Sequence, residues 1–209
     1  MEGFFHKIRY LFLGVFYGIA LKMPSYALYR IIPIAVFKAY SVLRKNDVNL
    51  ILDAGCGTGN VIKRFQEIDQ MYNNLGRKFI VGFDVDFSQL KISKNAGLYD
   101  AAILADARYL PFRAKSFDLV LAMEIIEHLN KSDGKEFIRN LEKIARKQII
   151  ISTPLGFFKT PYYKNEWQRH KSGWLPTEFS RMGYKVRYFL YLNIFSLKLG
   201  MLCYKDFYS

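Results

Sequence analysis

The strongest signal in this chain of 209 residues is the segment LILDAGCGTG, at residues 50–59. It is typical of a short apolar strand that reaches an acid, Asp53, and then passes into a turn with glycine at positions 55, 57 and 59. Residues 60–70 follow with apolar side chains at helical spacing. Because glycine has no Cβ, the backbone N–H groups of such a turn can approach a bound molecule closely. The pattern therefore predicts a strand, a turn and a helix that together hold a nucleotide-like cofactor.

Predicted strands alternate with predicted helices from residue 49 onward. The further strands are expected at 78–84, 101–105, 117–123, 148–152, 184–191 and 197–207. The further helices are expected at 88–95, with Ser88 as N-cap and Gly97 as the stop, and at 132–146 and 176–182. Near-continuous apolar strands separated by helices indicate a parallel sheet covered on both faces. We therefore expect an α/β fold with a doubly wound, mostly parallel sheet of seven strands.

Three acids stand at the ends of three successive predicted strands, namely Asp53, Asp84 and Asp106. In open parallel sheets, ligands bind beyond the carboxyl ends of the strands, which is where these acids are expected to meet. The dinucleotide fingerprint is G-x-G-x-x-G, whereas this turn has the spacing G-x-G-x-G directly after an acid. A nucleotide-binding dehydrogenase is the alternative interpretation of the glycine turn alone.

With these motifs in this order, residues 49–154 resemble the class I S-adenosylmethionine-dependent methyltransferases, whose fold is Rossmann-like. The resemblance implies that Asp84 accepts hydrogen bonds from the ribose hydroxyls and that Asp106 accepts one from the adenine amino group. Ionised carboxylates suit these donors, and no phosphate has to be accommodated beside Asp53. The cofactor-binding residues that the resemblance implies are Asp53, Gly55, Cys56, Gly57, Gly59, Asp84, Val85, Asp106, Ala107 and Met123.

A second motif, EIIEH at residues 124–128, follows the predicted strand 117–123. A similar Glu-x-x-Glu-His pattern holds a divalent metal in ubiquinone-pathway O-methyltransferases and in small-RNA 3′-end 2′-O-methyltransferases. The RNA enzymes add a later histidine, and His170 is similar in placement. The resemblance thus implies a site for Mg²⁺ or a similar ion formed by Glu124, Glu127, His128 and His170.

The same Glu-x-x-Glu-His pattern also occurs in methyltransferases of this class that are not known to use metal. In that case His128 or His170 would be the general base, because imidazole titrates near neutral pH. The predicted catalytic residues are Glu124, His128 and His170.

The chain is expected to hold one methyltransferase domain, residues 46–209, after an N-terminal helical extension, residues 1–45. The extension carries apolar residues at helical spacing among Lys and Arg. We favour a cap over the substrate pocket, and the second interpretation is a helix lying on an anionic membrane surface. Its apolar run, residues 11–21, is shorter than the about 20 residues that span a bilayer, and no convincing signal-peptide cleavage site follows. Residues 155–182, rich in aromatics at their start, are expected to form an insert on the substrate side.

The formal net charge is +13, from 31 Lys and Arg against 18 Asp and Glu. Such a charge favours partners that are anionic, such as a nucleic acid, a membrane surface or an acidic small molecule, although a basic solvated surface alone would also produce it. The two cysteines, Cys56 and Cys203, are not expected to form a disulfide, because Cys56 lies inside the glycine turn. We therefore expect a cytoplasmic protein, with peripheral contact to the inner membrane face as an alternative.

Three functions follow from these patterns. The favoured one is O-methylation of a small apolar or aromatic acceptor, because no known RNA-binding module is appended and the basic residues are scattered. The second is methylation of RNA, which would use the basic surface and aromatic stacking. The third is a cofactor-binding module without enzymatic activity.

Overall fold

The computed structural model describes residues 48–72, 77–157, 165–193 and 196–207. The predicted N-terminal helical extension, residues 1–45, lies outside the described residues, so its two interpretations stay predictions. Within the described part of the chain, no helix is long and apolar enough to cross a membrane.

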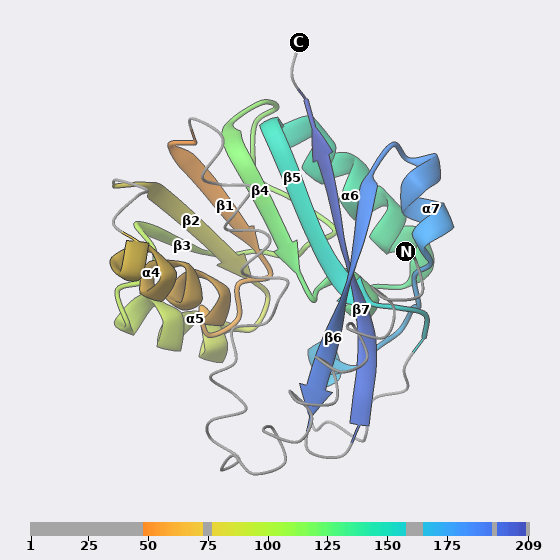
Figure 1. Cartoon of the computed structure of the whole chain (residues 1–209). Helices are drawn as coiled ribbons and strands as arrows, with labels where there is room; N and C mark the ends of the chain where they lie inside the picture. The colour runs from red at the N-terminus through yellow and green to blue at the C-terminus, as the bar shows by residue number, and fades with distance from the viewer. Residues whose placement is uncertain (1–47, 73–76, 158–164, 194–195, 208–209) are drawn as a thin grey trace.

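Seven strands form one sheet in the order β3-β2-β1-β4-β5-β7-β6 (Figure 1). Strands β1 to β5 pair in parallel, and β7 runs antiparallel between β5 and β6. This confirms the predicted seven-stranded, mostly parallel, Rossmann-like sheet. The strands are β1 Leu50–Ala54, β2 Phe79–Asp84, β3 Ala101–Leu104, β4 Phe117–Met123, β5 Ala145–Pro154, β6 Lys185–Asn193 and β7 Ser196–Asp206. The helices are α4 Asn60–Tyr72, α5 Phe87–Asn95, α6 Lys131–Ile144 and α7 Pro176–Arg181, with short 3₁₀ turns η1 Ile126–His128 and η2 Glu166–Gln168.

The sheet buries a separate apolar cluster on each face, because successive strand residues point to opposite sides. In β4, Val120 belongs to one cluster, whereas Leu119 and Leu121 belong to the other. The first cluster includes side chains of α6, Trp174 and Phe179, and the second includes side chains of α4. Strands buried on both faces explain the near-continuous apolar runs of the sequence.

Most predicted element ends differ from the observed ones by one to three residues, and two of these differences change the role of a residue. The N-cap of α5 is Asp86 rather than Ser88: the carboxylate oxygen Oδ1 of Asp86 accepts hydrogen bonds from the backbone N–H of Ser88 (2.9 Å) and of Gln89 (3.4 Å). Asp86 is the N-cap because the helix begins one residue earlier than predicted, at Phe87. The Asp86 carboxylate therefore faces the free N–H groups of the first helical turn. The stop at Gly97 is consistent with the structure, where this residue follows the C-cap with φ +65°.

The second such difference is at the end of α6, which finishes at Ile144, so Arg146 lies in β5 instead of the helix. Ala145 already pairs with Phe117 of β4, and this strand pairing overrides the helical pattern of the segment.

The carboxyl ends of β1, β2, β3 and β4 lie at one edge of the sheet, because these strands run in parallel with Asp53 opposite both Gly82 and Leu121. The segments that leave this edge are the glycine turn after β1, the loop into α5 after β2, and η1 after β4. These segments supply the residues of the site.

Candidate active site

The glycine turn after β1 is built so that only glycine fits at its critical positions. Gly55 has φ +70°, and a Cβ there would lie 2.4 Å from the Cδ1 atom of Ile125. Gly59 has φ +85°, and its Cβ would lie 2.4 Å from the Cδ1 atom of Leu98. The backbone N–H groups of Gly55 and Cys56 both donate to the carbonyl oxygen of Phe83 at 2.9 Å, which ties the turn to β2. The sequence thus places bare backbone at the edge of the sheet.

Asp84 is fixed at the end of β2 by two backbone donors. Its Oδ2 accepts from the N–H of Gly57 at 2.7 Å, and its Oδ1 accepts from the N–H of Asp86 at 2.8 Å. Burial raises the pKa of Asp84 above its ordinary value, although these hydrogen bonds act in the opposite direction. Each carboxylate oxygen still has a second lone pair, so the group can accept from a diol.

Asp106 is paired with Arg108, a residue that the sequence reasoning did not single out. The guanidinium donates to both carboxylate oxygens of Asp106, through Nε at 3.0 Å and Nη2 at 2.6 Å. These hydrogen bonds lower the pKa of Asp106, so the carboxyl is ionised near neutral pH and available to an amino donor. No sequence signal beyond the spacing of two residues would have indicated this pair.

A cavity of about 230 Å³ opens over this edge of the sheet. Its lining joins the glycine turn and α5 on one side to η1, η2 and the start of α6 on the other. The predicted site residues that line it are Gly55, Gly57, Asp84, Val85, Asp106, Ala107, Glu124 and His128. Among the residues that sequence reasoning missed, Asp86, Gln89, Arg108 and Gln168 also line it.

Other predicted cofactor residues lie behind the cavity wall. Asp53, Cys56 and Met123 are buried in the structure, and neither they nor Gly59 line the cavity. Asp53 instead accepts a hydrogen bond at 2.7 Å from the hydroxyl of Tyr99. Burial raises the pKa of Asp53 to about 6, and the nearby charge of Asp84 adds to this rise, while the Tyr99 hydrogen bond acts against it. Tyr99 was missed, although Gly82, a glycine inside a strand, signals such a close approach: a Cβ there would lie 2.8 Å from the Tyr99 ring.

Glu127, His128 and His170 come together beside the cavity. One possible ligand atom from each lies within 4.8 Å of the other two. The rings of His128 and His170 meet edge to face, with their centroids 4.9 Å apart. Glu124, the fourth residue implied by the resemblance, is not part of this group, and its Oε1 accepts a hydrogen bond from the Ser152 hydroxyl at 2.6 Å. The structure thus brings together three of the four predicted ligands.

Burial determines the charge of the group. Burial and then the nearby Glu124 raise the pKa of Glu127 well above its ordinary range, while its Oε2 accepts from the Thr153 hydroxyl at 3.0 Å. Burial and then His170 lower the pKa of His128 to about 4, so this imidazole is neutral at pH 7. The Nδ1 atom of His128 lies 3.3 Å from the carbonyl oxygen of Arg169; a proton on Nδ1 would donate to that oxygen and leave Nε2 as the free acceptor. A neutral imidazole oriented in this way is suited to bind a cation, while its lowered pKa weakens it as a base near pH 7.

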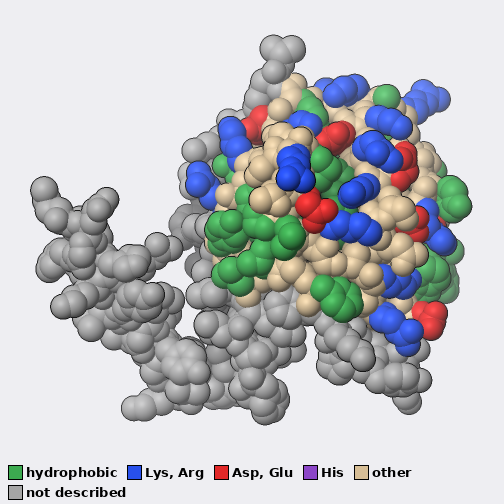
Figure 2. Space-filling view, turned by 90° about the vertical axis from the view of Figure 1, so that its right-hand side faces the viewer, with side chains coloured by type: hydrophobic (Ala, Val, Ile, Leu, Met, Phe, Trp, Pro, Cys, Tyr) green, Lys and Arg blue, Asp and Glu red, His purple; other side chains and the backbone are tan. Residues whose placement is uncertain are grey.

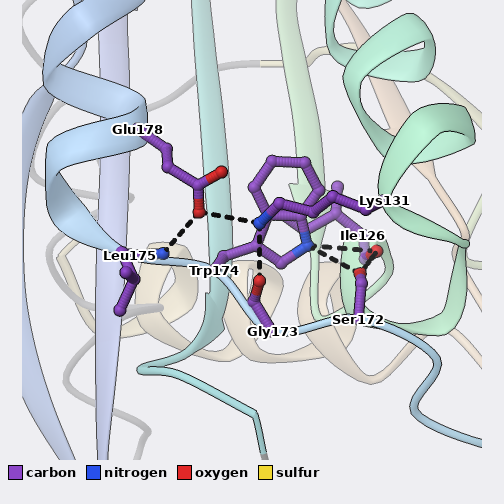
Figure 3. A network of polar contacts seen from close by, with 7 residues as sticks. All are labelled: Ile126, Lys131, Ser172, Gly173, Trp174, Leu175 and Glu178. Atoms are coloured by element: carbon purple, nitrogen blue, oxygen red, sulfur yellow. Dashed lines mark hydrogen bonds and ion pairs between the residues drawn. The ribbon is translucent and has the colours of Figure 1, made fainter.

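A network of polar contacts holds residues 172–175, which follow His170 closely in the chain (Figure 3). The backbone N–H groups of Lys171 and Ser172 both donate to the carbonyl oxygen of Glu127, at 2.7 and 3.1 Å. The ammonium of Lys131 lies 3.7 Å from the centroid of the buried Trp174 ring and donates to the Gly173 carbonyl (2.6 Å). The Lys131 ammonium also donates to the Glu178 carboxylate at 2.7 Å. The segment after His170 is therefore anchored to η1, α6 and α7 at once.

The sequence of this chain matches that of known proteins over the same region. The family described as a methyltransferase domain matches residues 52–151. An uncharacterized protein of Methanocaldococcus jannaschii is 30% identical over 120 residues, which cover 56% of this chain and 48% of that protein. The malonyl-[acyl-carrier protein] O-methyltransferase of Hamiltonella defensa is 26% identical over 57% of this chain and 43% of its own length. The small RNA 2′-O-methyltransferase of Arabidopsis thaliana is 25% identical over 56% of this chain and 13% of its own length.

Solved structures show the same fold. The magnesium protoporphyrin IX methyltransferase of Synechocystis with bound S-adenosylmethionine has a TM-score of 0.55 at 15% identity, over 81% of this chain and 77% of that chain. The chain spans half or less of the length of the curated relatives it matches. The glycine turn, the acids near the strand ends, the sequence match and the fold agree: residues 52–151 match the methyltransferase-domain family, and the described part of the chain has the fold of S-adenosylmethionine-dependent methyltransferases.

Proposed function

We propose that this protein transfers a methyl group from S-adenosylmethionine to a hydroxyl oxygen, with a divalent cation held by Glu127, His128 and His170. The observation that carries the proposal is the meeting of these three side chains within 4.8 Å beside the cofactor cavity. Each offers a ligand atom that Mg²⁺, Mn²⁺, Fe²⁺ or Zn²⁺ accepts, one carboxylate and two imidazoles, and a buried carboxylate favours a nearby positive charge. A bound cation would orient the acceptor oxygens and lower the pKa of the attacking hydroxyl.

The residues of the chain itself would align the acceptor and remove its proton. Methyl transfer from a sulfonium is an in-line displacement, so the cavity has to align the acceptor with the methyl group and remove a proton. Thr153 holds the Glu127 carboxylate, and the Arg169 carbonyl orients His128. Without a cation, the free Nε2 atom of His128 is the general base that this geometry offers.

A small acceptor with an apolar or aromatic ring is the first candidate. Trp167 lines the cavity with 47% of its surface exposed, which offers a flat face to such a ring. The relative from Hamiltonella defensa is named as an O-methyltransferase of malonyl-[acyl-carrier protein], which is not a nucleic acid.

RNA is the second candidate, and a basic side chain beside an exposed aromatic ring at the cavity favours it. Arg108 and Lys171 both line the cavity, and the Lys171 ammonium lies 5.7 Å from the centroid of the Trp167 ring. A cation beside an aromatic face suits a phosphate next to a stacked base. The relative from Arabidopsis thaliana is named for 2′-O-methylation of small RNA.

The test of the cation is direct binding together with turnover. We expect the purified protein to bind Mn²⁺ in calorimetry, and we expect chelation to lower methyl transfer to a panel of hydroxyl acceptors, with Mg²⁺ or Mn²⁺ restoring it. Glu127→Gln should weaken Mn²⁺ binding about tenfold or more, because the buried carboxylate supplies the negative charge. Glu136→Gln, on the exposed side of α6, is the matched control and should bind Mn²⁺ like the wild type.

Binding of S-adenosylhomocysteine should be unchanged in Glu127→Gln, since this residue does not line the cofactor cavity. Full turnover in chelator, or a wild type that binds no Mn²⁺, would remove the cation from the proposal and leave His128 as the base.

A further inference from the structure

Residues 165–172, here named the strap, form one wall of the cofactor cavity. Trp167, Gln168 and Lys171 of the strap line the cavity together with Asp84 and Asp86 on the opposite side. The strap is far from Asp86 in sequence, so tertiary contacts alone hold it there.

The two ends of the strap are held differently. The Ser172 end is anchored to η1 by backbone hydrogen bonds and continues into the buried Trp174 and its Lys131 contact. At the other end, the Nδ2 group of Asn165 donates to the Oδ2 atom of Asp86 at 2.6 Å. This contact joins partly buried side chains that belong to segments 79 residues apart.

Asp86 and Asn165 each make a further hydrogen bond, and it uses a different side-chain atom from the one in their mutual contact. Asp86 uses its Oδ1 atom to cap α5, and Asn165 uses its Oδ1 atom to accept from the Trp167 N–H at 3.0 Å. The Oδ2 atom of Asp86 and the Nδ2 group of Asn165 therefore meet without using the atoms of either cap, and the Oδ2 atom also accepts from the Nε2 group of Gln89 at 3.3 Å. Burial of Asp86 is slight, and hydrogen bonds from Ser88 first of all lower its pKa, so the acceptor is an ionised carboxylate.

We propose that Asp86 and Asn165 form a clasp that holds the strap closed over the bound cofactor, so that the clasp must open before the cofactor leaves. The anchored Ser172 end is the fixed end of this movement and the Asn165 end is the one that opens. The gating role depends on the cofactor alone and not on the cation or the acceptor.

The test is the release rate of S-adenosylhomocysteine, measured by stopped-flow displacement. Loss of a charge-assisted hydrogen bond in Asn165→Ala should raise the release rate about tenfold. Asn165→Asp should raise it at least as much, because two carboxylates then face each other while the Trp167 cap is kept. Asn95→Ala, at the far end of α5, is the matched control and should release the product at the wild-type rate.

The decisive variant exchanges the two side chains. In Asp86→Asn combined with Asn165→Asp, the new asparagine keeps Oδ1 for the α5 cap and can donate its Nδ2 to the new carboxylate. The release rate should then return to within about threefold of the wild type, since the hydrogen bond is restored with its direction reversed. A wild-type release rate in Asn165→Asp, or an exchange variant as fast as Asn165→Asp, would overturn the clasp. Thermal melting of each variant separates a loss of the clasp from a loss of the fold.

Discussion

At the scale of single residues, Asp53 shows how burial changes the task of a motif residue. It follows the pattern of an acid next to a glycine turn, yet its side chain is 1% exposed and bonded to Tyr99. Burial raises its pKa to about 6, above the value of about 3.9 in an unfolded chain. The stability that the protonated carboxyl contributes is therefore present at low pH and is lost as the pH rises through 6.

Asp53→Asn should remove this pH dependence, since an amide does not ionise. Between pH 4.5 and 7.5, we expect the free energy of unfolding of the variant to rise relative to the wild type by about 2 kcal/mol. Urea unfolding without cofactor at the two pH values measures the difference.

Asp118→Asn is the control for Asp53→Asn. Burial acts to raise the pKa of Asp118, but hydrogen bonds from the Asn49 and Leu50 backbone and the charges of Lys147 and Arg146 lower it overall. Its contribution is therefore lost only as the pH falls through values below 4, and the difference from wild type should be constant from pH 4.5 to 7.5. A constant difference for Asp53→Asn as well would contradict the raised pKa.

At the scale of elements, α6 contains Gly134, although glycine has a low helix propensity. A Cβ on Gly134 would lie 2.6 Å from the Cζ2 atom of Trp174. The glycine lets the helix approach the indole, whose Nε1–H donates to the Ser172 hydroxyl at 3.1 Å. Packing between α6 and the segment behind His170 thus outweighs the helix propensity at this position.

Gly134→Ala should destabilise the protein despite the about 1 kcal/mol that alanine gains in a helix. Overpacking against Trp174 costs about 1–3 kcal/mol, so we expect a net loss of about 1 kcal/mol in urea unfolding.

The same change in a Trp174→Phe background should be neutral or stabilising, because the smaller ring leaves room for the new methyl group. Equal effects of Gly134→Ala in both backgrounds would show that the two side chains are not coupled.

At the scale of the whole molecule, the net charge of +13 is visible as a basic surface. On the side of the molecule that carries α7, Lys and Arg side chains outnumber Asp and Glu and are spread over the face (Figure 2). A spread charge attracts any polyanion weakly, whereas Arg108 and Lys171 line the cavity itself.

If RNA is the acceptor, its affinity should fall steeply with salt, and Lys171→Gln should reduce the slope of log K against log salt by about one. Lys135→Gln, an exposed lysine of α6 that does not line the cavity, should change the slope less. Filter binding of a short single-stranded RNA at several salt concentrations measures both slopes. Binding that is absent or indifferent to salt would leave the small acceptor as the candidate.

The domain division into residues 1–45 and 46–209 also belongs to this scale, and it stays a prediction. The residues on the N-terminal side of this boundary lie outside the described part of the chain.

Local sequence patterns are enough to predict the helices and strands of this protein and the edge of the sheet at which a cofactor would bind. Apolar runs bounded by acids and glycines are local signals. Gly55 and Gly59 have positive φ angles, which favour glycine. Asp84 ends β2 and Asp106 follows the end of β3 by two residues, so the parallel pairing of these strands brings both acids to one edge of the sheet.

Which side chains meet across that edge depends on the tertiary structure. It turned Glu124 toward Ser152, joined Glu127 and His128 to His170, and placed Asn165 against Asp86. These contacts depend on distances between segments that are tens of residues apart, and such distances are set by packing on the sheet and not by local periodicity.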